Sequence, residues 1–311
     1  MKVIVTGGAG FIGSHTVDAL VKNKHDVLII DNLSTGNEEY VNTAAEFIKG
    51  DIKDKTLIEK TFVEFRPDAL VHLAAQIDVR KSTEDPAFDA EVNILGSLNL
   101  YQACIKNRTK KVVFASTGGA IYGDTDNRPT PESAKAKPES PYGIAKLTNE
   151  KYLYYYNKVH QLGYVALRYG NVYGPRQNPH GEAGVVAIFS KKLIEKEEAV
   201  INGDGKQTRD YVFVSDVVRA NVLALEERSE KHIFNVGTGK ETDVNKVFNS
   251  IKTVLGSMAE EKHGEAKLGE QQTSCLSYTE LYETFKWQPE VEFKDGIKQT
   301  VDWFKNNLKS A

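Results

Sequence analysis

Cysteine is nearly absent from this sequence. The chain has 311 residues and two cysteines, Cys104 and Cys275, without a C-x-x-C spacing or a neighbouring histidine cluster. This usage excludes a disulfide framework and a structural zinc site, and it predicts a protein of the reducing cytoplasm. The seven histidines include no paired spacing such as H-x-x-x-H, so we expect no metal.

An excess of one charge and a long apolar run are also lacking. The 40 basic residues stand against 43 acidic ones, which gives a net charge of -3. Such a balance offers no electrostatic footprint for nucleic acid or an anionic membrane. No apolar stretch reaches the length of a bilayer span. We therefore expect neither nucleic acid nor a membrane among the partners.

Strand and helix patterns alternate through the first half of the chain. Continuously apolar strands in such an order predict a parallel sheet that is covered on both faces. The fold class is therefore α/β, with a Rossmann-type doubly wound parallel sheet. The predicted strands are 2–6, 26–30, 46–49, 69–73, 111–115 and 164–168, and the predicted helices are 11–22, 54–65, 89–106 and 141–160.

A glycine-rich turn follows the first predicted strand. The sequence VIVTGGAGFIGSH places Gly7, Gly10 and Gly13 between a strand and a helix. A turn of this kind brings backbone N–H groups against a pyrophosphate at the start of the helix. Gly7 permits the turn, Gly10 permits the close approach, and Gly13 lets helix and strand pack. An ordinary βα turn is the alternative.

An acidic residue ends the second predicted strand. Asp31 lies close to the roughly 20-residue offset expected for a ribose-binding acid. Its carboxylate can accept from both ribose hydroxyls and would repel a 2′-phosphate, which favours NAD over NADP. A plain turn residue is the alternative, because DNLSTG is turn-like. Asp51 and Ile52 follow the third strand and are predicted to meet the adenine.

The pattern loosens after Gly170, where glycine, proline and charge become more frequent. We predict an NAD-binding Rossmann domain over residues 1–170, with segments near 212–240 returning to it, and a smaller α/β substrate-binding lobe over 171–311. The lobe half contains a predicted helix at 217–225 with Ser215 as its N-cap, a strand in HIFNVGTG, and a C-terminal helix at about 296–308.

Two hydroxyl residues, Ser116 and Thr117, lie where the strand 111–115 runs out. A strand that ends in this way delivers side chains into a cleft. The next predicted helix carries Tyr142 and Lys146 at i and i+4, which puts them on one helix face. Two other Y-x-x-x-K pairs begin at Tyr154 and Tyr282, but neither lies at the start of that helix. We assign Tyr154 to an aromatic packing stripe.

The Tyr142–Lys146 pair predicts a general base. A phenol has a pKa of about 10 and is a poor base at neutral pH. An ammonium about 4 Å away is worth roughly 4 kcal/mol at an effective dielectric constant near 20. That energy equals about three pKa units. With the positive nicotinamide ring beside it, the phenol is expected to ionise near neutrality. A surface helix pair is the alternative.

Eight segments in order resemble the extended short-chain dehydrogenase/reductases, the NAD-dependent epimerase/dehydratase family. Within that family the chain is similar to the UDP-glucose (UDP-galactose) 4-epimerases. The likeness runs from Met1 to about Gly239. The segments are TGGAGFIGSH, DNLSTG, HLAA, STGGAIYG, SPYGIAK, RYGNVYGPRQ, RDYVFVSD and NVGTG.

The resemblance implies a reaction and a cofactor, NAD, which stays bound. Tyr142 takes the proton of the sugar 4-hydroxyl while C4 loses a hydride, and the 4-keto sugar turns over and is reduced on its other face. Thr117 matches the hydroxyl that forms a hydrogen bond with the sugar O4, and Lys146 matches the lysine that binds the nicotinamide ribose. The implied cofactor-binding residues are Gly7, Gly10, Phe11, Ile12, Gly13, Asp31, Asn32, Ser34, Gly36, Asp51, Ile52, Leu73, Ala74, Ala75, Tyr142, Lys146 and Tyr169.

The residues after Thr117 separate this chain from dehydrating relatives. Those enzymes carry an Asp-Glu pair there, because elimination needs an acid and a base. This chain has Gly118 and Gly119, which can do neither job and are expected to leave space beside O4. Oxidation followed by re-reduction needs only one base.

The resemblance also implies a substrate site. Asn171 and Arg209 match positions that hold the diphosphate, with a surface pair of Arg209 and Asp210 as the alternative. Residues 185–189 are expected to line the nucleotide pocket. Asn202, Lys267 and Ser274 depart from the family pattern, and Ser274 would widen the pocket for an N-acetyl group. The predicted substrate-binding residues are Thr117, Tyr142, Asn171, Val185, Asn202, Arg209, Tyr211, Lys267 and Ser274.

The expected partners are a UDP-hexose and a second copy of the chain. Relatives pair through the helices that correspond to 89–106 and 141–160, and both helices carry more large side chains than one buried face needs. These side chains are Leu95, Leu98, Tyr101, Tyr152, Leu153, Tyr155 and Tyr156. Packing of all of them inside one chain is the alternative. Two other functions stay open: another nucleotide-sugar enzyme (a uronate 4-epimerase, reductase or dehydratase) and a non-catalytic NAD-binding sensor.

Overall fold

A seven-stranded sheet forms the centre of the computed structural model, which describes residues 1–180, 184–266 and 271–308. All its strands are parallel, in the order β11-β6-β5-β4-β1-β2-β3. The order reverses between β1 and β4, where open sheets of this type bind their ligands. The strands are β1 (Lys2–Thr6), β2 (Asp26–Asp31), β3 (Glu46–Lys49), β4 (Ala69–His72), β5 (Lys111–Thr117), β6 (Gly163–Tyr169) and β11 (Ile233–Val236).

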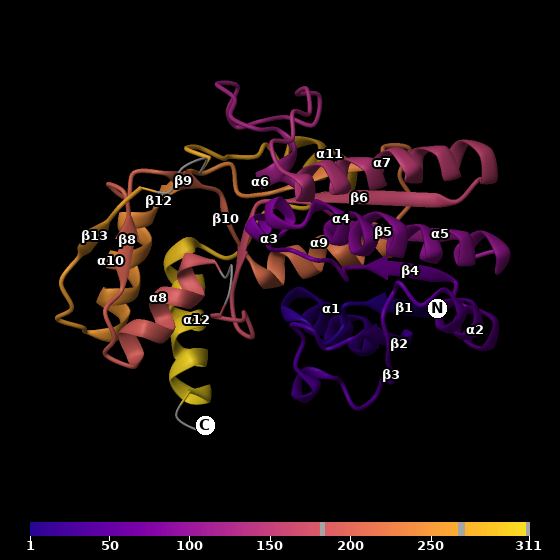
Figure 1. Ribbon diagram of the computed structural model, residues 1–311, viewed down its shortest axis with the longest axis horizontal. Coiled ribbons are helices and arrows are strands. Elements are labelled where there is room, and N and C mark those ends of the chain that lie inside the picture. Colours follow the sequence, from indigo (N-terminus) through magenta and orange to yellow (C-terminus); the bar gives the residue numbers. More distant parts are fainter. Residues whose placement is uncertain (181–183, 267–270, 309–311) are drawn as a thin grey trace.

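Helices cover both faces of this sheet (Figure 1). Side chains alternate across each strand, so Val3 and Val5 enter one core and Ile4 enters the other. The first core is closed by α1 (Phe11–Lys22), α9 (Val214–Glu226) and α11 (Thr279–Phe285). The second is closed by α2 (Lys55–Phe65), α5 (Ser97–Lys106) and α7 (Pro141–His160). Each fully buried Leu, Ile or Phe side chain contributes about 1.5–3 kcal/mol relative to exposure.

A smaller lobe lies beside the carboxyl ends of the strands, at the left of Figure 1. Its core joins α8 (Val185–Ile194), α10 (Val244–Leu255) and α12 (Phe293–Asn307) through side chains such as Phe189, Phe248 and Ile297. Three two-stranded sheets complete it. They are formed by β7 (Asn171–Tyr173) with β10 (Tyr211–Phe213), β9 (Thr208–Arg209) with β12 (Thr242–Asp243), and β8 (Val200–Asn202) with β13 (Lys262–Gly264).

The α/β Rossmann-type fold is confirmed, and two local expectations are wrong. The predicted helix 89–106 is divided into α4 (Pro86–Ala90), a π-helical turn η2 (Glu91–Gly96) and α5. The carbonyl of Asn93 accepts from Ser97 Oγ and Asn149 Nδ2, both at 2.7 Å, which disturbs the regular helical ladder. Ser215 does not cap α9, because the helix begins at Val214 directly after β10.

The remaining short elements connect the sheet to its helices. They are η1 (Glu38–Tyr40), α3 (Val79–Glu84) and α6 (Gly118–Ile121). β11 and α9 belong to the central layers although they follow residue 170 in the chain. The division of the chain into two domains stays a prediction. In the part of the chain that the structure describes, no helix has the length and apolarity to cross a bilayer.

A buried ion pair, which the sequence did not indicate, lies under the end of β5. Arg168 binds Glu150 through two hydrogen bonds of 2.9 and 2.6 Å, and both side chains are almost fully buried. Ser116 donates to Glu150 at 2.7 Å, so the hydroxyl expected in the cleft points into the protein instead. Arg168 also donates to the Tyr122 hydroxyl at 2.8 Å. Although burial opposes its charged form, the bonds to Glu150 raise the pKa of Arg168.

We predict that Glu150→Ala lowers the free energy of unfolding by about 3–5 kcal/mol, because it leaves the Arg168 charge buried without a partner. Urea denaturation would measure the change. The control is Glu64→Ala, which removes an exposed pair with Lys60 at 3.9 Å. It should cost less than about 1 kcal/mol. Equal losses in the two variants would contradict the role given to the buried pair.

Candidate active site

The glycine turn after β1 is shaped by close backbone approaches. Gly7 has a φ of 72°, and a Cβ atom there would lie 2.7 Å from the nitrogen of Ala74, just after β4. A Cβ atom at Gly13 would lie 1.9 Å from the Gly7 oxygen. Both positions therefore need glycine. The turn thus lies against the segment after β4, at the place where the strand order reverses.

Helix α1 begins at this turn without a side-chain cap. Gly10 is the N-cap residue and cannot supply an oxygen to the first N–H groups of the helix. An uncapped helix start at the end of a parallel strand suits a phosphate group, because the helix dipole and the N–H groups both favour negative charge. This feature fits the diphosphate of a dinucleotide.

Asp31 lies at the end of β2 and is almost fully buried. Its Oδ2 accepts from the Ala9 N–H at 3.0 Å, and its Oδ1 accepts from the Leu33 N–H at 2.8 Å. Each carboxylate oxygen keeps further acceptor capacity for a ribose hydroxyl. Asn32 donates to Asp51 Oδ2 at 3.1 Å, so the acids after β2 and β3 lie at one edge of the sheet. This donor and acceptor set fits NAD, whereas a 2′-phosphate would meet a carboxylate.

Most of the other predicted cofactor residues fall into two groups, and Phe11 instead packs against the core of the lobe. Gly36 and Ala74 border the glycine turn, and the Ser34 N–H donates to Asn32 Oδ1 at 2.9 Å. Ile52 and Tyr169 are instead buried. Leu73 is partly buried against the core that α1 and α9 close, and so is Ile12. The Tyr169 hydroxyl donates to Asn221 Oδ1 at 2.6 Å, so its polar end is already engaged inside the protein.

Thr117 and Tyr142 are brought together at the carboxyl end of β5. Ser140 caps α7 by accepting from the Gly143 N–H at 3.1 Å, which sets Tyr142 in the first helical turn. The Thr117 side chain lies close enough to the Tyr142 phenol to affect the pKa of that phenol. Thr117 Oγ1 also accepts from the Ala120 N–H at 3.2 Å and caps α6. Two hydroxyls therefore meet at one point of the sheet edge.

Lys146 is held by a backbone carbonyl of β5. Its ammonium is buried and donates to the Ala115 carbonyl at 2.8 Å. The Nζ atom lies 5.7 Å from the centre of the Tyr142 ring and 4.9 Å from that of Phe114. Burial lowers the pKa of Lys146 to about 8, and the charge of Asp89 opposes that shift.

The sequence predicted that Lys146 lowers the pKa of Tyr142. This prediction is wrong, because the protein's own groups raise that pKa. Burial raises the pKa of the phenol, the carboxylate of Asp89 adds to the rise, and the hydrogen bond to Thr117 opposes it. The reason is that the loss of hydration disfavours the phenolate by more than Thr117 favours it. At neutral pH the phenol held in this way is protonated.

Asp89 is a part of the site that sequence reasoning missed. Its side chain is almost fully buried, and Oδ1 accepts from Gln76 Nε2 at 3.0 Å and from Asn93 Nδ2 at 2.9 Å. Burial raises its pKa, and the two hydrogen bonds oppose the rise. The i, i+4 spacing of Asp89 and Asn93 indicates that the two side chains lie near each other, but it does not indicate what they face.

The two glycines after Thr117 have different surroundings. A Cβ atom at Gly118 would lie 2.3 Å from Leu276 Cδ1, so a side chain already fills that place and the expected free space is absent. A Cβ atom at Gly119 would lie 3.7 Å from Asn171 Oδ1 and 4.0 Å from Thr117 Oγ1, which are ordinary contacts. The space beside the hydroxyl pair is therefore at Gly119 alone.

Asp210 contradicts the surface pair considered for Arg209. Its carboxylate is fully buried and accepts from the N–H groups of Thr238, Gly239 and Leu276 at 2.8, 3.1 and 3.1 Å. Burial raises its pKa, and these bonds oppose the rise. Arg209 Nη1 donates to the Thr208 carbonyl at 2.8 Å. Asp210 thus fixes Leu276, the residue that packs against Gly118.

The predicted substrate residues are dispersed over the lobe. Asn171 lies next to Gly119, at the hydroxyl pair. Val185 begins α8, and Tyr211 is buried in the lobe core near Tyr173, at 6.2 Å between ring centres. The remaining positions are Asn202 at the end of β8, Ser274 buried beside Thr208, and Lys267, which lies outside the described residues.

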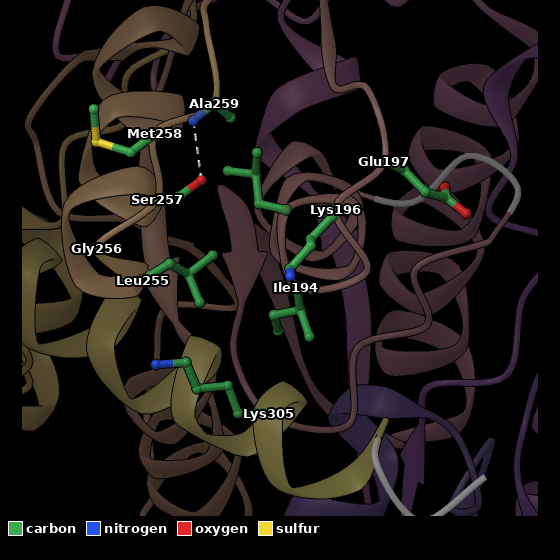
Figure 2. A pocket seen from close by; sticks show the side chains of 10 residues that line it. Ile194, Lys196, Glu197, Leu255, Gly256, Ser257, Met258, Ala259 and Lys305 are labelled. Carbon is green, nitrogen blue, oxygen red and sulfur yellow. Dashed lines mark hydrogen bonds between the residues drawn. The ribbon is translucent and has the colours of Figure 1, made fainter.

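Two cavities lie away from the hydroxyl pair. The larger one, of about 600 Å³, lies among the ends of α8 and α10 and the side of α12, where Ile194, Leu255 and Lys305 line it (Figure 2). The second, of about 520 Å³, borders Ala9 and Gly36 of the cofactor edge. Among the described residues, no group of three or more His, Cys, Asp and Glu is arranged for a metal ion.

Comparison with known proteins gives one family. Residues 3–237 match the NAD dependent epimerase/dehydratase family. The UDP-glucose 4-epimerase of Thermotoga maritima, solved with UDP-glucose, has a TM-score of 0.97 and 47% identity over 99% of this chain and 100% of that one. The UDP-glucose 4-epimerase of Thermus thermophilus, solved with NAD, has a TM-score of 0.94 and 43% identity over 99% of this chain and 100% of that one. The UDP-N-acetylglucosamine 4-epimerase of Methanobrevibacter ruminantium has a TM-score of 0.92 and 37% identity over 98% of each chain.

We predict that Gly118→Ala is less stable than Gly119→Ala by about 1–3 kcal/mol, because the new methyl group must displace Leu276. Both residues lie in α6, so the gain in helix propensity is matched and the difference reports the clash alone. Chemical denaturation of the two variants measures it. Equal free energies of unfolding would contradict this prediction, because they would show that Leu276 can move aside without loss of stability.

Proposed function

This chain belongs to the NAD-dependent epimerase/dehydratase family, and we propose that within it the chain is a nucleotide-sugar 4-epimerase that interconverts UDP-glucose and UDP-galactose. The observation that carries the proposal is the position of Thr117 beside Tyr142 at the carboxyl end of β5. The pair lies on the edge of the sheet that carries the glycine turn and Asp31, with no carboxylate at Gly118 or Gly119.

The chain's own residues have separate tasks in this reaction. The uncapped start of α1 and the carboxylate of Asp31 would hold NAD, which when bound would supply the acceptor and the donor of a hydride at the sugar C4. Thr117 orients the 4-hydroxyl toward Tyr142, which takes its proton and later gives one back. Lys146, which is anchored on the Ala115 carbonyl, supplies positive charge near the ring of Tyr142.

The raised pKa of Tyr142 sets a condition on this chemistry. A neutral phenol is a poor acceptor for the proton of a sugar hydroxyl, so removal of that proton needs an added positive charge close to the phenol. An oxidised nicotinamide is a cation and meets the condition, whereas a reduced one is neutral. The protein's own residues therefore tie proton removal to the oxidised state of the site.

Among the alternatives, another nucleotide-sugar enzyme of the family is less well supported. Elimination needs an acid and a base near the sugar. The position of Gly118 is filled by Leu276, which leaves no place there for a carboxylate. Asp89 is held by two amide groups. A non-catalytic NAD sensor has no need for the Thr117–Tyr142 contact.

The sugar could also carry an N-acetyl group. Ser274 is a small residue at the position that the resemblance assigns to the sugar 2-substituent, and one structural relative is a UDP-N-acetylglucosamine 4-epimerase. Asn171, beside Thr117, and Arg209 are the residues we assign to the diphosphate. Incubation with both pairs of UDP sugars distinguishes the two substrate classes.

We predict that the purified protein interconverts UDP-glucose and UDP-galactose without added NAD, as followed by NMR. Tyr142→Phe should lower the rate by about 10²–10⁴-fold, since it removes the proton acceptor. The control is Tyr154→Phe, a half-exposed tyrosine with the same spacing to a lysine, Lys158. Its rate should equal that of the wild type. No turnover of any UDP sugar by the wild type would defeat the proposal.

We place the reaction in the cytoplasm. Cys104 and Cys275 are both free and buried, which suits a compartment where thiols stay reduced. Burial raises the pKa of each thiol to about 12, so neither one forms a reactive thiolate at neutral pH.

We further propose a homodimer through α7 and the neighbouring turn η2. Leu95, Tyr152, Tyr155 and Val159 are 56%, 37%, 47% and 58% exposed, and the last three recur along one face of α7. Tyr101, Leu153 and Tyr156 are instead buried within the chain. Only some of the large side chains on these helices are therefore exposed. Those on α7 form one apolar face, which suits a symmetric contact.

We predict that the protein sediments as a dimer and that Tyr155→Lys shifts it toward the monomer, because a charge enters an apolar contact. Tyr282→Lys is the control, since Tyr282 is 45% exposed on α11 at the other face of the sheet. A monomeric wild type would contradict the proposal, and so would a Tyr155→Lys variant that remains fully dimeric.

A further inference from the structure

The glycine turn and the loop after Asp31 form one unit. The Ala9 N–H donates to Asp31 Oδ2 at 3.0 Å, and the Asn37 N–H donates to the Ala9 carbonyl at 3.0 Å. Gly36 lies against both sides of this contact, because a Cβ atom there would be 3.1 Å from Ala9 and from Asp31 Oδ1. The parts assigned to the diphosphate and to the ribose are therefore joined by direct hydrogen bonds.

The loop ends at Tyr40, whose ring meets two side chains from the far end of the chain. The ring of Trp303 in α12 lies 6.4 Å from it, at an interplanar angle of 67°. The guanidinium carbon of Arg176 lies 5.6 Å from its centre. Arg176 also binds Asp18 of α1 at 2.8 Å. The segment after β7 and the C-terminal helix thus both contact the cofactor loop.

These contacts border the smaller cavity. Its lining includes Ala9 and Gly36 on one side and Tyr40, Arg176 and Trp303 on the other. The cavity thus lies between the cofactor edge and the lobe. A displacement of the loop that carries Tyr40 with it would break both of these contacts.

We propose that Tyr40, Arg176 and Trp303 form a clasp that holds the cofactor loop closed and slows the release of NAD. The clasp rests on the proposed function, because it concerns the cofactor of that reaction. A reaction that returns the hydride to the same sugar has no need to exchange its cofactor. Slow release is therefore compatible with turnover, unlike in a dehydrogenase, where the reduced cofactor must leave.

The rate of NAD release tests the clasp. The protein is saturated with NAD and then diluted into isotopically labelled NAD, and the exchange is followed by native mass spectrometry. Tyr40→Ala should release NAD about tenfold faster, because it removes an aromatic pair and a cation–π contact. The control is Tyr282→Ala, whose ring is 45% exposed and has Lys286 Nζ 5.5 Å from its centre. It should match the wild type.

A double substitution separates a clasp from general loosening. Trp303→Leu should also speed release, and the Tyr40→Ala/Trp303→Leu double variant should be no faster than Tyr40→Ala alone, because both remove the same contact. Multiplied effects, or a wild-type rate in both single variants, would overturn the clasp. If Tyr40→Ala does not fold, Trp303→Leu carries the test by itself. A wild type that binds no NAD would overturn the proposed function instead.

Discussion

Burial of Tyr142 and Lys146 beside one buried acid is the constraint on which the chemistry of this site depends. Desolvation disfavours the phenolate and the ammonium alike, so it raises one pKa and lowers the other. Asp89 favours the ammonium and opposes the phenolate. The protein's own groups therefore hold a neutral phenol, and the function proposed above needs a bound positive charge before the phenol can act. Such a dependence is useful in a reaction that must reverse, because the phenol has to donate a proton as readily as it accepts one.

Local signals in the sequence were sufficient to predict the glycine turn, the strand that ends at Asp31 and the start of α7. The glycine turn, Asp31 and the start of α7 depend on residues that lie close together in the chain, and their spacing alone indicates a βα unit and a capped helix. The parallel order of the strands then brings their carboxyl ends to one edge. The direction of the Lys146 ammonium was not predictable in this way, because its acceptor is a carbonyl of another strand.

Contacts between distant segments account for what the sequence did not show. Gly118 was interpreted as free space, but Leu276 fills its place from a segment that Asp210 fixes. Ser116 and Thr117 were grouped as two hydroxyls in a cleft, yet consecutive strand residues face opposite ways, and Ser116 joins Glu150 inside the protein. A pattern of residue types does not give the partner of a buried polar group, which only the packed structure selects.

The same tertiary contacts help to explain how this fold supports an oxidation that is followed by re-reduction of the same sugar. A buried ion pair under β5 and the buried carboxylate of Asp210 fix the two segments that meet at Gly118. Neither group is among the residues assigned to the reaction, and each would be costly to leave without its partners. Their cost is acceptable where the geometry of a hydroxyl pair must stay constant through oxidation and re-reduction. Because a 4-keto sugar has to turn over between the two hydride transfers, movement is needed in the substrate, and rigidity is needed in the protein edge that it turns against.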